Sequence, residues 1–126
     1  RTSSDGGGTG MFISGNNLHY DWDNQHWSWR SNITVPNNEW SMIAVSIGPS
    51  SATAYLCKKS GITTATNTVS HPVTTGHKFY IACDPGRFSL DRTFIGKIAT
   101  SMVYSSTLTS DNITAIFNAQ KAAFGL

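Results

Sequence analysis

Phe94-Ile-Gly-Lys-Ile-Ala-Thr-Ser-Met-Val-Tyr104 is the stretch that decides the fold. Its β-branched and aromatic residues predict one long strand over residues 94–104. Gly96 within this strand predicts a bulge or a close backbone approach. A short polar turn and a capped amphipathic segment follow. A long strand that leads into one terminal helix is an unusual ending for a domain, so it narrows the choice of architecture.

The segment after this strand has the start and stop signals of a helix near residues 109–122. Thr109 is the predicted N-cap, and Asp111 in the first turn complements the helix dipole. Leu108 can contact Ile113 as a hydrophobic staple, although Asn112 takes the place of the Glu of a full capping box. Gly125 is a C-terminal stop signal. The predicted buried stripe consists of Ile113, Ile116, Phe117 and Phe124.

The rest of the chain is a series of short alternating runs separated by turn residues, which is typical of an all-β protein. Residues 31–38 contain Pro36 and several Asn, so we expect a loop there. Together with the terminal helix, the runs predict a two-sheet antiparallel β-sandwich. The predicted strands cover residues 11–14, 18–22, 26–30, 40–47, 52–57, 62–69, 78–83 and 94–104.

Length and composition limit the class of protein. The chain has 126 residues, which suits one domain, and only 13% of them are charged. The abundance of Ser, Thr, Asn and Gly favours an extracellular, cell-surface or virion-surface location. The net charge is +2 and the longest basic run is Lys58-Lys59, so we expect no nucleic-acid partner. No apolar run approaches the ~20 residues of a membrane-spanning helix, so we expect no membrane insertion.

Four pieces of the sequence, in consistent order over residues 40–124, resemble laminin-G-like, concanavalin-A-like jelly-roll domains. These pieces are the Trp-x-x-x-Ala-Val run from Trp40, the Tyr55-Leu56 hairpin, residues 79–84, and the closing strand with its helix. The resemblance implies a lectin-like sandwich, and some members of this family bind Ca²⁺ at one rim.

Two departures from the family pattern change what the resemblance implies. The family usually carries Ile-Asp-Glu-Val in the closing strand, whereas this chain has Ile98-Ala-Thr-Ser101, so any site that depends on those acids is lost. Such domains also begin with strands before the glycine-rich loop seen here at residues 5–8. We therefore expect residues 1–126 to be one sandwich domain whose first strands lie on a preceding segment or come from a neighbouring chain.

An aromatic hairpin is the first candidate for a binding site. If its turn centres on Asn24-Gln25, Trp22 lies opposite Trp27 and Tyr20 lies opposite Trp29. Four rings then share one face of the hairpin, and four polar residues share the other. The rings can form either a sugar-stacking platform or part of the core, and core is the commoner fate of such a face. In the second case the polar face is the better candidate for glycan binding. The rings are Tyr20, Trp22, Trp27 and Trp29, and the polar residues are His19, Asp21, Ser28 and Arg30.

Acidic residues and cysteines provide further candidates. Asp84 and Asp91 bracket one loop, and Asp21 and Asp23 flank Trp22, so carboxylate oxygens are available for Ca²⁺. Seven acids in all, without a dense Asp/Asn loop, argue against a calcium site, so no cofactor is required. Cys57 and Cys83 form either one disulfide or two buried thiols.

The chain lacks the usual signatures of catalysis. Glu39 is the single Glu, whereas a sandwich glycosidase needs two closely spaced carboxylates. No Gly-x-Ser-x-Gly elbow is present. We therefore expect no enzyme, and two functions remain open. One is a non-catalytic module that binds glycan. The other is a structural protein that assembles with other subunits, such as a virion decoration or a fibre surface.

Overall fold

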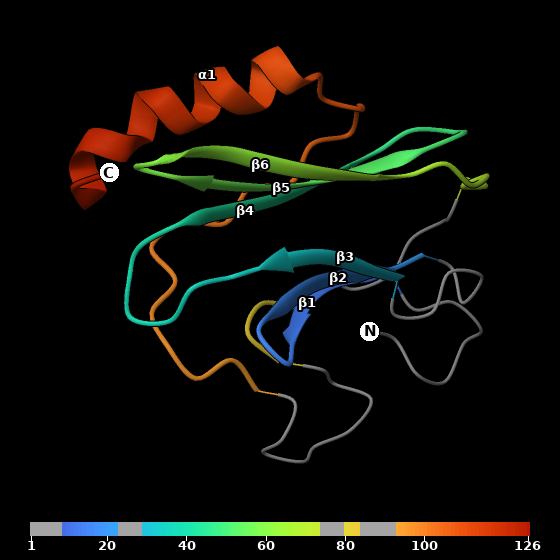
Figure 1. Cartoon of the computed structure of the whole chain (residues 1–126). Helices are drawn as coiled ribbons and strands as arrows, with labels where there is room; N and C mark the ends of the chain where they lie inside the picture. The colour runs from blue at the N-terminus through green and yellow to red at the C-terminus, as the bar shows by residue number, and fades with distance from the viewer. Residues whose placement is uncertain (1–8, 23–28, 74–79, 84–92) are drawn as a thin grey trace.

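A computed structural model describes residues 9–22, 29–73, 80–83 and 93–126. Two three-stranded antiparallel sheets form its centre (Figure 1). The first sheet contains β1 (Gly10–Ser14), β2 (Asn17–Asp21) and β3 (Trp29–Thr34) in that order. The second contains β4 (Met42–Ile47), β5 (Ala52–Lys58) and β6 (Gly61–Asn67), also in sequence order. The predicted two-sheet β-sandwich with one C-terminal helix is confirmed.

The two sheets pack face to face through one apolar core. On the second sheet, Ala54 and Leu56 of β5 are buried in it, with Ile43 and Val45 of β4 packed against them. These side chains alternate along their strands, so they share one face of the sheet. The first sheet contributes Leu18 and Ile33, with Ile13 and Trp29 beside them, and Val35 joins them from the position just after β3.

The helix covers the opposite face of the second sheet. Helix α1 (Ser110–Gln120) continues into the 3₁₀ turn η2 (Lys121–Phe124), and Figure 1 shows it lying across β4, β5 and β6. Ile113 and Phe117 of the helix are buried against Tyr55 and Cys57 of β5. The domain therefore has three layers, in which a helix covers one sheet and that sheet covers another.

Both ends of the helix are capped as the sequence predicts, with one addition. Thr109 is the N-cap and its side chain accepts a hydrogen bond from the backbone N–H of Asn112. The Asn112 side-chain oxygen accepts in return from the backbone N–H of Thr109 at 3.0 Å, so Asn completes the box that Glu usually forms. At the other end Gly125 adopts a left-handed conformation with φ 69°, and the N–H of Leu126 donates to the carbonyl of Lys121.

The predicted loop over residues 31–38 is wrong in its first half, because β3 extends to Thr34. Ile33 is 4% exposed and fills the core, which outweighs the turn propensity of its polar neighbours. A register shift between β2 and β3 and a positive φ of 59° at Asn32 accommodate the irregular sequence. Strand β4 also begins at Met42 rather than at residue 40.

The two predicted strands near the end of the β region are also wrong. Of the residues predicted over 78–83, Tyr80–Cys83 are described, and they form only an isolated bridge between Cys83 and Thr93. Residues 94–104 are not in a strand. Their composition favours a strand, but a strand also requires a neighbour with which to form a ladder. Gly96, predicted to mark a bulge or a close backbone approach, is approached by a side chain instead, since a Cβ there would be 2.7 Å from the ring of Phe94.

Candidate functional site

The outer face of the first sheet carries a row of three side chains from three strands. Antiparallel pairing sets Phe12 opposite His19 and His19 opposite Arg30. Because Leu18 and Ile13 point into the core, their neighbours His19 and Phe12 point outward. The sequence analysis places His19 and Arg30 on one face of the hairpin, and the structure sets them directly opposite each other. We refer to Phe12, His19 and Arg30 as the outer row.

The outer row combines an aromatic contact with a positive charge. The rings of Phe12 and His19 are stacked, with centroids 5.1 Å apart and planes at 21°. Arg30 is exposed, and it forms no ion pair with the part of the chain that the structure describes. Guanidinium groups donate five hydrogen bonds in a planar fork, which suits carboxylate and hydroxyl oxygens. The row can therefore bind an oxygen-rich ligand beside an apolar surface.

Asp21 lies on the same strand face but differs from the outer row in its exposure. It is 5% exposed, whereas Arg30 is exposed and His19 is half-buried. A buried carboxylate is shielded from a ligand in solvent, and it is stabilised by hydrogen bonds or charges from the protein around it. Asp21 is therefore a candidate for positioning the sheet end rather than for direct contact with a ligand.

The predicted aromatic face points inward. Tyr20 lies opposite Trp29, as the sequence analysis expects, and the two ring centroids are 5.3 Å apart. Tyr20 is 1% exposed and Trp29 packs against the central core, so neither ring is an open platform for stacking. Trp22 is half-buried, and its indole N–H donates to the carbonyl of Pro72 at 2.8 Å. Trp27 lies outside the described residues.

His71 completes this cluster and was missed by the sequence analysis. Its Nε2 lies 2.6 Å from the hydroxyl of Tyr20, which also accepts a hydrogen bond from the Asn67 side chain at 2.9 Å. Its ring meets that of Trp22 edge-on. Burial raises the pKa of Tyr20, and the hydrogen bond from Asn67 opposes that rise. No local pattern marks His71, because its partner is 51 positions away.

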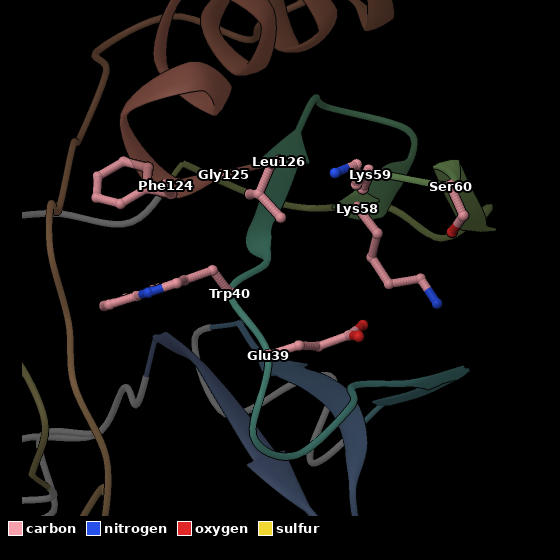
Figure 2. Close-up of a pocket in the computed structure, with 8 residues that line it drawn as sticks. All are labelled: Glu39, Trp40, Lys58, Lys59, Ser60, Phe124, Gly125 and Leu126. Atoms are coloured by element: carbon pink, nitrogen blue, oxygen red, sulfur yellow. The ribbon is translucent and has the colours of Figure 1, made fainter.

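A second candidate is a cavity of about 330 Å³ between the segment that precedes β4, the β5–β6 turn and the C-terminal turn (Figure 2). Trp40 is 39% exposed, and the centroid of its ring lies 5.4 Å from the centroid of the Phe124 ring. Figure 2 shows the Trp40 ring directed away from Lys58 and Glu39, which point to the other side. The aromatic and charged groups of this cavity therefore face different directions. Its lining consists of Glu39, Trp40, Lys58, Lys59, Ser60, Phe124, Gly125 and Leu126.

The described residues do not assemble a metal site. No group of three or more His, Cys, Asp or Glu side chains lies together within them. Asp23, Asp84 and Asp91, the other acids considered for Ca²⁺, lie outside the described ranges, as does Ser28 of the predicted polar face. The described residues therefore provide no calcium site.

Both cysteines are free thiols, so of the two predicted states the structure shows the unbonded one and not the disulfide. Cys57 is fully buried in β5, and burial raises its pKa to about 11. Cys83 is exposed, contrary to the expectation that two free thiols would both be buried. No helix within the described ranges is long and apolar enough to cross a membrane.

The geometry defines a class of protein: a β-sandwich that a helix covers on one side and that has a polar outer face on the other. The comparison with family models identifies the family. The model of the concanavalin A-like lectin/glucanases superfamily, in its laminin G-like branch, matches residues 1–114. The chain therefore belongs to this family. The match also covers residues 1–39, which precede the motifs found over residues 40–124. Searches found no matching curated protein and no matching solved structure.

Proposed function

We propose that this chain is a non-catalytic binding module that recognises glycan through the outer row. The observation that carries the proposal is the alignment of Phe12, His19 and Arg30 on the sheet face opposite the core. Its family includes lectins and glucanases, so a carbohydrate ligand is consistent with its lineage. An extracellular, cell-surface or virion-surface location goes with this proposal, supported by the low charged fraction of 13%.

The absence of catalysis is part of the proposal. Asp21, Glu39 and Asp111 are the carboxylates within the described ranges, and they belong to β2, to the segment before β4 and to α1. Glycoside hydrolysis by a retaining enzyme needs two carboxyl groups about 5 Å apart across one bond. Sugar binding needs no such pair, only hydrogen-bonding groups beside an apolar surface.

A glycan array with neutral and acidic oligosaccharides, with and without Ca²⁺, tests the proposal, followed by calorimetry with the best ligand. Arg30→Ala should weaken binding by roughly ten- to 150-fold, which corresponds to the ~1.5–3 kcal/mol of a hydrogen bond to a charged group. Lys59→Ala is the matched control, because it also removes one exposed cation but at the Trp40 cavity. Loss of binding in Lys59→Ala but not in Arg30→Ala would move the site to that cavity. No binding to any glycan would contradict the proposal.

A structural role in an assembly is the second candidate function, and one observation favours it. Residues 94–104 expose large apolar side chains, among them Ile95 at 93% and Val103 at 70%. Exposed apolar groups of this kind are common where a protein meets another chain. Subunits of an assembly would then be the partners in place of, or in addition to, a glycan.

A further inference from the structure

Asn32 lies on the outer face of the first sheet, next to the outer row. Exposed and buried side chains alternate along β3, so Asn32 is exposed while its neighbours Ser31 and Ile33 are buried. Because Ile33 packs in the core between the sheets, Asn32 points to the opposite face, on which Arg30 also lies. The two residues are two positions apart, which is at most about 7 Å along a strand. Their side chains can therefore contact the same ligand.

A bulge in β3 fixes the backbone of Asn32. At the register shift, four steps along β3 span the same stretch as two steps along β2. The buried Ser31 hydroxyl donates to the carbonyl of Leu18 at 2.7 Å and accepts from the N–H of Ile33 at 3.1 Å. Asn32 has a φ of 59°, in the left-handed region that Asn adopts more readily than most side chains. Bulges change the direction of a side chain, and the exposed side chain of this bulge is Asn32.

The polar groups of Arg30 and Asn32 are available to a ligand. Among residues 9–22, 29–73, 80–83 and 93–126, neither side chain forms a hydrogen bond or an ion pair. The planar guanidinium of Arg30 matches a carboxylate with two parallel hydrogen bonds, and the Asn32 amide both donates and accepts. Asp21 is the one acidic residue in β1, β2 and β3, and it is only 5% exposed. The exposed charge on this face is therefore positive.

We propose that Arg30 and Asn32 together select a glycan whose sugar ring carries a carboxylate. The Arg30 guanidinium binds the carboxylate, the Asn32 amide binds a hydroxyl of the same or the next ring, and the stacked Phe12 and His19 border the apolar side of the sugar. One exposed cation suits one carboxylate, because a polysulfated chain would leave its other anionic groups without a partner. This inference rests on the proposed function, since it names the ligand class of the outer row and adds Asn32 to the site.

Calorimetry with three carboxylated probes, each compared with its own methyl ester, tests the ligand class. The probes are sialyllactose, oligogalacturonate and oligoglucuronate, and the ester removes the charge while keeping the sugar. At least one acid should bind about tenfold more tightly than its ester, because only the acid forms charge-assisted bonds with Arg30. Equal affinity for acid and ester, or binding of neutral or sulfated glycans alone, would overturn the inference and leave glycan binding intact. No binding to any glycan would contradict the proposed function as well.

Asn32→Gly separates the role of the amide from that of the backbone. Gly adopts the left-handed conformation without strain, so this variant keeps the bulge and loses only the side chain. It should bind the acid roughly three- to tenfold more weakly, as expected for one lost hydrogen bond. Asn38→Gly is the matched control, because Asn38 is also exposed with a φ of 62° but lies outside the sheet, between β3 and β4. Wild-type affinity of Asn32→Gly would show that Asn32 serves the backbone alone, and would overturn its part in the site.

Asn32→Asp tests the charge at the same position. Asp has nearly the same size as Asn and also tolerates a positive φ, but it adds a carboxylate next to Arg30. This carboxylate repels the acidic probe and competes with it for the guanidinium, so affinity for the acid should fall more than affinity for the ester. Equal losses for the acid and the ester would contradict the binding of the carboxylate beside Asn32.

Discussion

The hydroxyl oxygen of Tyr20 and Nε2 of His71 lie 2.6 Å apart, although 51 positions separate the two residues in the sequence. The contact joins strand β2 of the first sheet to the segment that follows β6 of the second. Asn67, the last residue of β6, donates to the same hydroxyl. A buried hydroxyl with two partners thus links the two sheets beyond their shared apolar core.

Replacing Tyr20 by Phe should destabilise the domain by ~1–3 kcal/mol, because the Asn67 and His71 side chains lose a buried partner. Urea unfolding followed by tryptophan fluorescence measures the change. Tyr104→Phe is the matched control, since its hydroxyl donates only to the sulfur of Met102 at an exposed position. Equal stability of the Tyr20→Phe variant and the wild type would show that the hydroxyl contributes nothing.

Replacing Phe117 by Ala should cost ~3–5 kcal/mol, because it leaves a cavity between α1 and the buried side chains of β5. Thermal unfolding by circular dichroism provides the measurement. Asn118→Ala changes the neighbouring exposed position of the same helix and should have little effect. If both variants unfold at the wild-type temperature, the helix does not form a layer of the core.

The two thiols should react at very different rates. Cys83 is exposed and should react with a thiol reagent at once, whereas Cys57 is fully buried and should react only on unfolding. The measurement is the number of thiols titrated before and after addition of denaturant. Two protected sulfurs that appear only after reduction would show a Cys57–Cys83 disulfide instead.

Stability should also fall at alkaline pH through Cys57. Its pKa is about 11 in the folded state against an ordinary 9.0, so the unfolded chain releases its proton first as the pH rises. The stabilising contribution is complete below pH 9.0 and is lost as the pH approaches about 11. Urea unfolding across this window should show a steeper decline for the wild type than for Cys57→Ala. The pKa of Tyr20 is also raised, so the stability of both the wild type and Cys57→Ala should decline to some extent at alkaline pH. Equal declines in the two proteins would contradict the assignment to Cys57.

The sequence was sufficient for features set by local chemistry. The helix, with its Thr109 cap, and the pairing of Tyr20 with Trp29 both follow from short-range rules of capping and hairpin register. His71 could not be predicted in the same way, because its role depends on contacts between distant segments. Residues 94–104 show a second limit: strand composition predicts a strand only where another strand is available to pair with it.

The site was predictable to a similar degree. Hairpin alternation placed His19 and Arg30 on one face, opposite the aromatic face, and the structure pairs them across β2 and β3. Phe12 was not predicted as their neighbour, because it comes from the preceding strand and its register depends on the turn at Gly15 and Asn16, both of which have positive φ. The burial of Asp21 also could not be inferred from alternation alone, since its side of the strand is the polar one.

Strand β5 belongs to two cores at once, and this has a consequence for how the domain unfolds. Ala54 and Leu56 lie in the core between the sheets, whereas Tyr55 and Cys57 lie in the core beneath the helix. If either core opened alone, β5 would lose the buried contacts on one of its two faces. The helix and the first sheet should therefore melt together in one cooperative transition, with the amides of β5 the slowest in the domain to exchange.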